Sequence, residues 1–391
     1  MTAVELAERF RANRLSLLAK DLEGTLVEDK VLVSRMLRAR HLLMKNSVWA
    51  QTYDHPRLRE KSIYEFSNAF ARFYISARNS DADTPAVFAP FYDKLVGEIQ
   101  QKGMTITGEW SACASLEELW GRAESIEELN WVQSEVSKPG SKASTQFSCD
   151  DLKLVVPAEV KQRMLERATE FTRRFEVPDP AAAANQIFLS TAQAYLPASG
   201  GLYWGFGPEA YEFTRGELGA ILECYASPFN HSLPVFCSPI QPLDCVYGSL
   251  CSFYENKVVV DFVKAVGEKE PAVIVANPPY IEAELQGCSD RLAALGADPP
   301  AAGLRVVSIF PKWDGAGGVV GMEAQCSQRV VLEPEQHAYY DYQTGRFIPA
   351  RFASLGFVLG WPKNGEAEQK CAEVFKLLAH GGKRSKKRRT Q

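Results

Sequence analysis

The sequence has 391 residues but no long apolar run, no Cys-x-x-Cys pair, and no basic start followed by an apolar stretch. Without about 18 consecutive uncharged apolar residues, no membrane-spanning helix is expected. Without a basic and then apolar N-terminus, we expect no secretory signal. The nine cysteines are an odd number, which favours free thiols in a reducing compartment over a disulfide framework.

Four of the cysteines, Cys224, Cys237, Cys245 and Cys251, fall within a short stretch of the chain. A metal site is one interpretation of this spacing. We favour burial as small apolar side chains, because free cysteine is among the most buried residue types. No metal cofactor is therefore expected.

The net charge of the chain is negative outside one short basic segment. The net charge is −4, yet Lys383–Arg389 alone carries six positive charges, so residues 1–382 have a net charge of −10. A nucleic acid would then bind a local basic pocket and not a broad basic face. The basic segment has no apolar residue, which predicts disorder. We interpret it as a nuclear import signal, with a phosphate-attracting arm as the alternative.

The first 135 residues are expected to be mainly helical. One apolar stripe at helical spacing consists of Leu32, Met36, Ala39 and Leu43, with Arg35, Arg38 and Arg40 off that line. A second, aromatic stripe consists of Ile63, Phe66, Phe70, Phe73 and Tyr74. Core packing is our interpretation of the aromatic stripe, with a base-stacking platform as the alternative. Ser115 and Glu118 form a capping-box pattern that predicts another helix start.

Residues 136–150 are polar and contain Pro, Gly and Ser, which predicts a loop. A helix is expected from Pro157 to about Phe175, with the proline in its first turn. From about residue 182, short apolar runs alternate with helical stretches. The runs are Ala220–Tyr225, Ala272–Ala276, Arg305–Phe310, Arg329–Leu332 and Phe357–Gly360. Uninterrupted β-branched runs suit strands buried on both faces of an α/β sheet.

The motif Asn277-Pro278-Pro279-Tyr280 directly follows one of these runs. Ligands of α/β sheets bind beyond the carboxyl ends of the strands, so the motif is well placed for a site. The residue types suit methylation of an exocyclic amino group such as adenine N6. The Asn277 side-chain oxygen and the Pro278 carbonyl can each accept one N–H, and consecutive prolines make the turn rigid. The Tyr280 ring can stack on the base, an interaction that contributes about 1–3 kcal/mol.

A glycine-rich cofactor turn after the first strand is missing. Gly205-Phe206-Gly207 precedes a proline, and the glycines from Gly315 to Gly321 are separated from the preceding run by Pro311-Lys312-Trp313. We interpret the second group as a mobile loop and neither group as a cofactor cradle. The candidate first strand ends instead in Ala226-Ser227, whose small side chains would let a cofactor approach the backbone.

In combination, several short motifs resemble the phosphorylated-CTD-interacting-factor family of cap-specific adenosine methyltransferases. They are, in chain order, Leu202-Tyr203-Trp204, Glu223-Cys-Tyr-Ala-Ser-Pro-Phe-Asn230, Tyr247-Gly248-Ser249, Asn277-Pro-Pro-Tyr280, Phe310-Pro-Lys-Trp313, Met322-Glu323 and Glu335-Gln-His-Ala-Tyr339. The resemblance covers about residues 200–362. The family methylates N6 of the 2′-O-methyladenosine next to the 7-methylguanosine cap of mRNA, with a helical domain packed on a Rossmann-like domain.

The resemblance implies S-adenosylmethionine as the cofactor, capped mRNA as the substrate and the nucleus as the location. Catalysis is implied at Asn277, Pro278, Pro279 and Tyr280. Cofactor contacts are implied at Ala226, Ser227, Pro228, Phe229, Asn230, Tyr247, Gly248 and Asn277. Glu282 matches an acidic residue that follows the motif in the family, which implies contact with substrate or cofactor. A solvated carboxylate at a helix start is the alternative for Glu282.

The sequence departs from the family in three respects. Tyr280 stands where the family has Phe, and a larger polar ring could alter how many methyl groups are transferred. Known vertebrate members carry an N-terminal WW module. The matching Trp pair is not found here, so the RNA polymerase II tail is a partner that only the resemblance to the family suggests. An insertion around Tyr254–Glu270 precedes the catalytic strand.

Cap recognition would need aromatic rings around the cationic base and basic residues for the triphosphate. The candidates are Lys312, Trp313, Arg346 and Arg351 in the second half and Arg35 and Arg38 in the helical half. For each residue taken alone, we favour a solvated charge or a core aromatic over the cap-binding role.

The sequence therefore predicts an α/β protein with a Rossmann-like class I methyltransferase domain preceded by a mainly helical domain. The expected boundaries are 1–178 for the helical domain, 179–365 for the methyltransferase domain and 366–391 for a helix end and basic tail. The favoured function is methylation of a cap-adjacent adenosine. Methylation of another RNA, DNA or protein amide, and a catalytically inactive RNA-binding module, are the alternatives.

Overall fold

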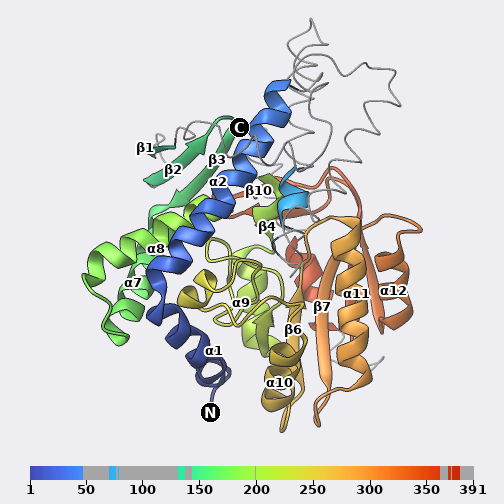
Figure 1. Cartoon of the computed structure of the whole chain (residues 1–391). Helices are drawn as coiled ribbons and strands as arrows, with labels where there is room; N and C mark the ends of the chain where they lie inside the picture. The colour runs from blue at the N-terminus through green and yellow to red at the C-terminus, as the bar shows by residue number, and fades with distance from the viewer. Residues whose placement is uncertain are drawn as a thin grey trace, which may run out of the picture. The chain divides into compact units, whose positions relative to one another are not determined.

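The computed structural model describes residues 1–46, 70–75, 78, 131–136, 143–198, 200–361, 369–370 and 372–378 (Figure 1). Among these residues, no helix has the length and apolar character needed to cross a membrane. The predicted Ile63, Phe66, Ser115 and Glu118, and the basic segment Lys383–Arg389, lie outside the described residues. The chain divides into two compact units, Ala19–Gly200 and a unit formed by Met1–Leu18 with Gly201–Gln391. The domain boundaries predicted from the sequence stay predictions.

The unit Ala19–Gly200 contains both helices and a sheet. Its helices include α2 (Leu22–Asn46), α7 (Ala158–Arg174) and α8 (Pro180–Tyr195). Its antiparallel sheet has the order β1-β2-β3, formed by Val132–Val136, Ser144–Cys149 and Leu152–Pro157. The predicted loop over residues 136–150 is therefore wrong for β2, which alternates buried and half-buried residues. The predicted helix after Pro157 is confirmed, with the proline at its N-cap.

The buried residues of α2 include Arg40, which was predicted to lie off the apolar stripe. Met36 and Ala39 are buried as expected, but Arg40 is also buried, at 1% exposure. Its guanidinium donates to Asp151 over 2.7 Å and lies 5.8 Å from the Phe70 ring centroid. A buried charge needs such a partner, and this partner is far away in sequence. Phe70 and Tyr74 are themselves fully buried, which confirms core packing for the described part of the aromatic stripe.

The second unit is built on a five-stranded sheet of order β5-β6-β7-β11-β8. The strands are Ala220–Glu223, Ala272–Ala276, Leu304–Pro311, Ser354–Leu359 and Gln328–Leu332. All five predicted apolar runs are therefore strands. Every residue of β6 and β11 is buried, as expected for strands covered on both faces, whereas β8 is half exposed at the sheet edge.

One strand of this sheet, β11, runs opposite to the other four. β5, β6 and β7 are parallel neighbours, and β11 runs antiparallel to both β7 and β8. Two isolated parallel bridges, Glu223 with Phe236 and Phe236 with Ser249, extend the order beyond β5. The order of sheet positions is therefore Ser249, Phe236, β5, β6, β7, β11 and β8.

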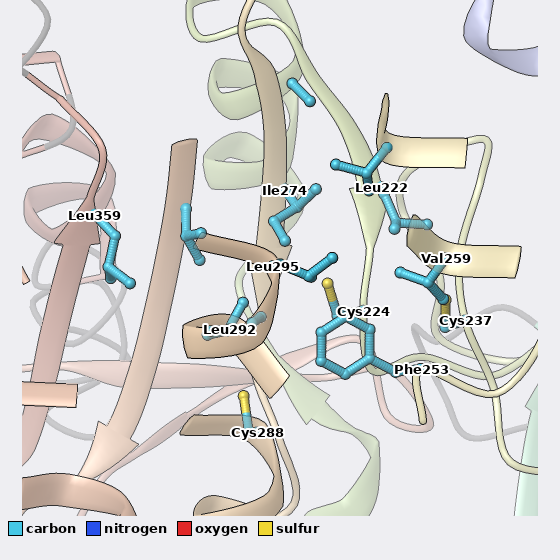
Figure 2. Close-up of a cluster of buried hydrophobic side chains, with 14 of the residues drawn as sticks. Leu222, Cys224, Cys237, Phe253, Val259, Ile274, Cys288, Leu292, Leu295 and Leu359 are labelled. Atoms are coloured by element: carbon cyan, nitrogen blue, oxygen red, sulfur yellow. The ribbon is translucent and has the colours of Figure 1, made fainter. Parts of the chain in front are cut away.

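Two apolar cores cover the two faces of the sheet. Alternate β6 residues separate them, since Ile274 belongs to one core and Val273 and Val275 to the other. Figure 2 shows part of the first core, which contains Leu222 of β5, Ile274 of β6, and Leu292 and Leu295 of α11 (Glu282–Ala297). This core also receives residues from α1 (Ala3–Lys20), α10 (Asn256–Val266) and α12 (Gly317–Gln325). The second core receives α9 (Pro208–Glu217) and residues 374–378.

Helix α12 replaces the mobile loop predicted for Gly315–Gly321, so that prediction is wrong. The glycines serve close packing between α12 and α11. A Cβ built on Gly318 would lie 2.4 Å from the Leu285 carbonyl carbon, and one on Gly317 would lie 2.3 Å from the Gln286 side chain. Glycine patterns that look like loop signals can thus mark contact between two helices.

Gly318→Ala is expected to destabilise the protein by about 1–3 kcal/mol, because the added methyl group would overlap the α11 backbone. Gly296→Ala on α11 is the matched control. A Cβ at Gly296 would have no heavy atom within 4 Å, so this change should be neutral or slightly stabilising. Urea unfolding of both variants measures the difference. Equal stability of the two variants would contradict the packing role.

A small sheet of order β10-β9-β4 completes this unit. It consists of Arg346–Pro349, Ala338–Asp341 and Trp204–Gly205. Its strands are short and alternate irregularly, so they were not predicted from the sequence. Through β4 it approaches the motif that follows β6.

Candidate functional site

The candidate site lies where the parallel strands β5, β6 and β7 end. Their carboxyl ends share one edge, so the segments that follow them lie close together: residues 224–230, 277–280 and 312–313. Ligand sites of open α/β sheets form at this edge. The sheet therefore assembles three of the predicted site segments.

Asn277 is the first residue after β6 and is half-buried. Its amide nitrogen Nδ2 donates to the Trp204 carbonyl oxygen over 3.3 Å. Since a carbonyl only accepts hydrogen bonds, this contact determines which end of the amide is nitrogen. The side-chain oxygen Oδ1 is then the end available to accept a hydrogen bond from a ligand.

The two prolines that follow leave no backbone N–H at their positions. Pro278 is buried, while Pro279 and Tyr280 are half-buried. Chain direction changes at once, because the Ile281 N–H donates to the Pro279 carbonyl over 2.8 Å and α11 begins at the next residue. The result is a short rigid turn between a buried strand and a helix.

The Tyr280 ring lies among other aromatic rings. Its centroid is 5.7 Å from that of Phe352, 6.0 Å from that of Tyr339 and 6.5 Å from that of Trp313. All three contacts are steep, at interplanar angles of 67° to 83°. Burial, together with the neighbouring Tyr339, raises the pKa of the Tyr280 hydroxyl well above its ordinary value. Tyr280 is therefore not a base at neutral pH.

The segment after β5 is organised by its own polar groups. Asn230 Oδ1 accepts from the Ser227 backbone N–H over 2.8 Å and from the Ser227 hydroxyl over 2.7 Å. The Phe229 N–H donates to the same hydroxyl over 3.2 Å. Ala226, Ser227, Pro228 and Phe229 are buried, and Asn230 is half-buried. Of the predicted cofactor residues in this loop, Asn230 has a partly exposed side chain with Nδ2 available as a donor.

Glu223, the last residue of β5, is a candidate functional residue to which the sequence analysis assigned no role. It is 3% exposed, and its Oε2 accepts from the backbone N–H groups of Ser232 and Leu233 over 2.8 and 3.1 Å. Its Oε1 accepts from the Tyr211 hydroxyl over 2.5 Å. Burial raises the pKa of Glu223 to about 7 against the opposing effect of these donors. An acidic residue inside an apolar strand was the signal available in the sequence.

Tyr247 and Gly248 lie further along the same side of the sheet. Tyr247 ends a short 3-10 helix (Leu243–Tyr247) and is buried. Gly248 has a φ of 118°, a conformation that favours glycine. The Phe236–Ser249 bridge places both next to the extended sheet, two positions away from β5.

The acidic residues after the motif differ in their surroundings. Glu282 is exposed at the start of α11, as expected for a solvated carboxylate at a helix start. Glu284 is 4% exposed, and its Oε2 accepts from the Tyr254 hydroxyl over 2.6 Å. Tyr254 in turn accepts from the Tyr225 hydroxyl over 3.1 Å. Glu284 thus connects α11 to the segment after β5.

The predicted substrate residues fall into two groups. Lys312 and Trp313 follow β7, and Trp313, which is 36% exposed, contacts Tyr280. Arg351 is exposed next to Phe352, and Arg346 is exposed at the start of β10. Arg35 and Arg38 belong to the other compact unit, on α2. The structure brings Trp313, Lys312 and Arg351 near the motif through adjacent residues.

The cysteines between residues 224 and 251 are buried and free. Burial raises the pKa of Cys224 well above its ordinary value and that of Cys245 to about 12. Among the described residues, no group of His, Cys, Asp and Glu side chains has the arrangement of a metal site. Cys113 and Cys371 lie outside those residues.

Comparison with known proteins supports the resemblance. Residues 187–342 match the family model described as "Phosphorylated CTD interacting factor 1 WW domain". The matched segment contains β4 to β9, and therefore the motif and the segments after β5 and β7. No curated protein matches the chain. The resemblance predicted from the motifs is confirmed for this segment.

Proposed function

We propose that this protein, which is similar to phosphorylated CTD interacting factor 1 over residues 187–342, is an S-adenosylmethionine-dependent methyltransferase. Its substrate would be the N6 nitrogen of the 2′-O-methyladenosine next to the 7-methylguanosine cap of mRNA. The observation that carries the proposal is the placement of Asn277-Pro278-Pro279-Tyr280 directly after a buried parallel strand, beside the segment that follows β5.

The order of the sheet supports a Rossmann-like methyltransferase fold. Numbered by chain order, Ser249, Phe236, β5, β6 and β7 follow the 3-2-1-4-5 order of doubly wound sheets. One antiparallel strand, β11, lies between β7 and the edge strand β8, and mixed sheets with an antiparallel strand are common among doubly wound folds. In this order the direction of winding switches between β5 and β6. The crevice at such a switch point is where doubly wound sheets bind nucleotides.

Asn277 and Pro278 supply two hydrogen-bond acceptors for an amino group. With Nδ2 bound to the Trp204 carbonyl, Asn277 Oδ1 can accept one N–H of the substrate, and the Pro278 carbonyl can accept the other. Two acceptors orient the nitrogen and favour electron density on it. Positioning of this kind contributes several kcal/mol to catalysis. The nitrogen loses a proton readily after transfer, so no strong base is required.

The segment after β5 fits a nucleoside cofactor. S-adenosylmethionine supplies an electrophilic methyl group on a sulfonium. Ser227 and Asn230 shape the loop through their mutual hydrogen bonds, and the small side chains at Ala226 and Ser227 allow close approach to its backbone. Tyr247 and Gly248 would bound the site on the side away from β6.

The cap would be held by residues near Tyr280. Trp313 offers a partly exposed ring, and Lys312 and Arg351 offer exposed charges for the triphosphate. Arg346 is a further candidate, and Arg35 and Arg38, on α2, stay predictions from the sequence. The basic segment Lys383–Arg389 supports a nuclear location.

Incubation with labelled S-adenosylmethionine tests the proposal. An RNA that begins with a 7-methylguanosine cap and 2′-O-methyladenosine is expected to be labelled at adenine N6. The same RNA without a cap, and a capped RNA that begins with guanosine, should stay unlabelled. Mass spectrometry of the digested RNA identifies the product and the number of methyl groups. Equal labelling of capped and uncapped RNA would contradict cap specificity, and absence of labelling would contradict the activity.

A further inference from the structure

Tyr280 is joined to the C-terminal strands by a continuous series of hydrogen bonds. Its hydroxyl oxygen lies 2.5 Å from that of Tyr339, which lies 2.8 Å from Ser354 Oγ. Ser354 Oγ lies 3.0 Å from His337 Nε2, and His337 Nδ1 lies 2.9 Å from the Glu333 carbonyl oxygen. We name the side chains of Tyr280, Tyr339, Ser354 and His337 the tyrosine relay. They come from the motif, β9, β11 and the residue before β9.

The carbonyl at the end sets the direction of every bond in the relay. A carbonyl only accepts, so His337 Nδ1 carries the proton, and in the neutral ring Nε2 is an acceptor. Ser354 therefore donates to Nε2, and Tyr339 donates to Ser354. Tyr280 must then donate to Tyr339. The proton of the Tyr280 hydroxyl is thus committed to the interior of the protein.

Three of the four side chains of the relay are buried, and the relay packs against rings. His337 and Ser354 are 0% exposed, and Tyr339 is 2% exposed. The Phe352 ring stacks on Tyr339 at 26° and contacts Tyr280 steeply at 75°. In such surroundings each hydrogen bond is shielded from water, and a broken one leaves a buried polar group unpaired.

We propose that Tyr339, Ser354 and His337 are positioning residues, which hold the Tyr280 ring in one orientation for the substrate base. This inference rests on the proposed function. A phenylalanine at position 280, as in the family, could not make the first bond, so the relay belongs to the tyrosine of this chain. The ring is anchored at both ends, by the rigid turn and by its hydroxyl, and loses little further freedom when a base stacks on it.

Protonation of His337 would reverse the relay. Burial lowers the pKa of His337 below its ordinary value, so the ring is neutral at pH 7. A doubly protonated ring donates from Nε2 to Ser354. Ser354 then donates to Tyr339, Tyr339 donates to Tyr280, and the Tyr280 hydroxyl proton points away from the relay. The titratable Tyr339 contacts the His337 ring from β9, and Tyr280 of the motif is bonded to Tyr339; burial raises the pKa values of both tyrosines. The side chains of Glu333, Glu335 and Arg351, on the adjoining segments, are exposed.

Tyr280→Phe, Tyr339→Phe and the double variant test the proposal through methyl transfer to capped RNA. Each single change is expected to lower kcat/KM about three- to tenfold, the effect of one lost hydrogen bond. The loss should fall on the KM for RNA, because stacking acts in the ground state and the transition state alike. The double variant should match Tyr339→Phe alone, since both changes break the same relay. Ser327→Ala, which removes a hydroxyl bonded to the Val358 carbonyl on the same sheet, should leave kcat/KM unchanged.

A pH profile separates positioning from general loss of structure. In the wild type, kcat/KM should fall as the pH drops through the lowered pKa of His337. In Tyr280→Phe this fall should disappear, because no hydroxyl remains at the end of the relay. Additive losses in the double variant, or the same fall in Tyr280→Phe, would overturn the relay while wild-type activity upholds the proposed function. A wild type that labels no RNA would overturn both.

Discussion

Asn277→Ala is expected to lower kcat/KM for methyl transfer by about 100-fold or more, the effect of losing one preorganised hydrogen-bonding group at a reacting centre. The variant loses Oδ1, one of the two acceptors proposed for the amino group. It also loses the donor to the Trp204 carbonyl. Without these contacts the nitrogen can rotate away from the line of methyl transfer, and displacement by about 1 Å is enough for a large loss. Initial rates with capped RNA measure the effect.

Asn185→Ala provides a matched control. Asn185 is exposed on α8, and its amide donates to the Ala181 carbonyl over 3.0 Å, so the same contact type is removed away from the motif. This variant should transfer methyl groups at the wild-type rate. Thermal unfolding of both variants shows whether the fold is intact. A folded Asn277→Ala protein with undiminished transfer would refute the role of Asn277 as an acceptor for the amino group, and with it the proposed mechanism.

Glu223→Ala is expected to have the largest effect on stability and to weaken cofactor binding. The change leaves three donors without a partner: the Tyr211 hydroxyl and the Leu233 N–H, both in buried residues, and the N–H of the half-buried Ser232. An unpaired buried group costs about 1–3 kcal/mol, so the total is on the order of 3–9 kcal/mol. The segment that follows Glu223 should become less ordered. Urea unfolding and calorimetry with S-adenosylmethionine measure the two effects.

Glu223→Gln retains the shape and separates hydrogen bonding from charge. The glutamine oxygen can accept from both N–H groups, and its nitrogen can donate to Tyr211, whose hydroxyl rotates. This variant should bind the cofactor as the wild type does, whereas Glu223→Ala should bind it more weakly. Equal cofactor affinity of the two variants would contradict the role of Glu223 in shaping the loop.

The two Glu223 variants also predict a pH effect. The pKa of Glu223 is raised in the folded protein, from 4.5 to about 7. Its protonated form is therefore favoured by folding, and this contribution is present below pH 4.5 and lost as the pH rises towards 7. The loss amounts to about 3 kcal/mol by the ordinary conversion of pKa shifts. Wild-type stability should fall more steeply over this range than that of Glu223→Gln.

Local patterns predicted the central sheet well. Ala272–Ala276 is β6 without a change of bounds, and the other four runs are strands. Such runs are legible because every residue of a doubly covered strand must be apolar. The sheet β1-β2-β3 and the strands β9 and β10 were not predicted. They are short or partly polar, and only pairing with distant segments makes them strands.

The candidate site was predicted in part. Asn277-Pro278-Pro279-Tyr280 was identified because its residue types and its place after a strand are both visible in the sequence. Glu223 and the relay partners of Tyr280 were not identified as functional. Ser232 lies 9 residues from its partner Glu223, and Tyr339 lies 59 residues from its partner Tyr280. The burial of Arg40 was likewise not predicted, because its partner Asp151 is 111 residues away.

The order of residues alone therefore determined the buried strands, the reactive turn and the family resemblance, because each depends on neighbouring residues. Tertiary structure decided which polar side chains meet, which glycines bring two helices into contact, and which tyrosine hydroxyl is committed to the interior. These outcomes depend on distances between segments remote in the chain. A linear pattern carries no such distances, and a buried polar group is stable only once its partner has been brought to it.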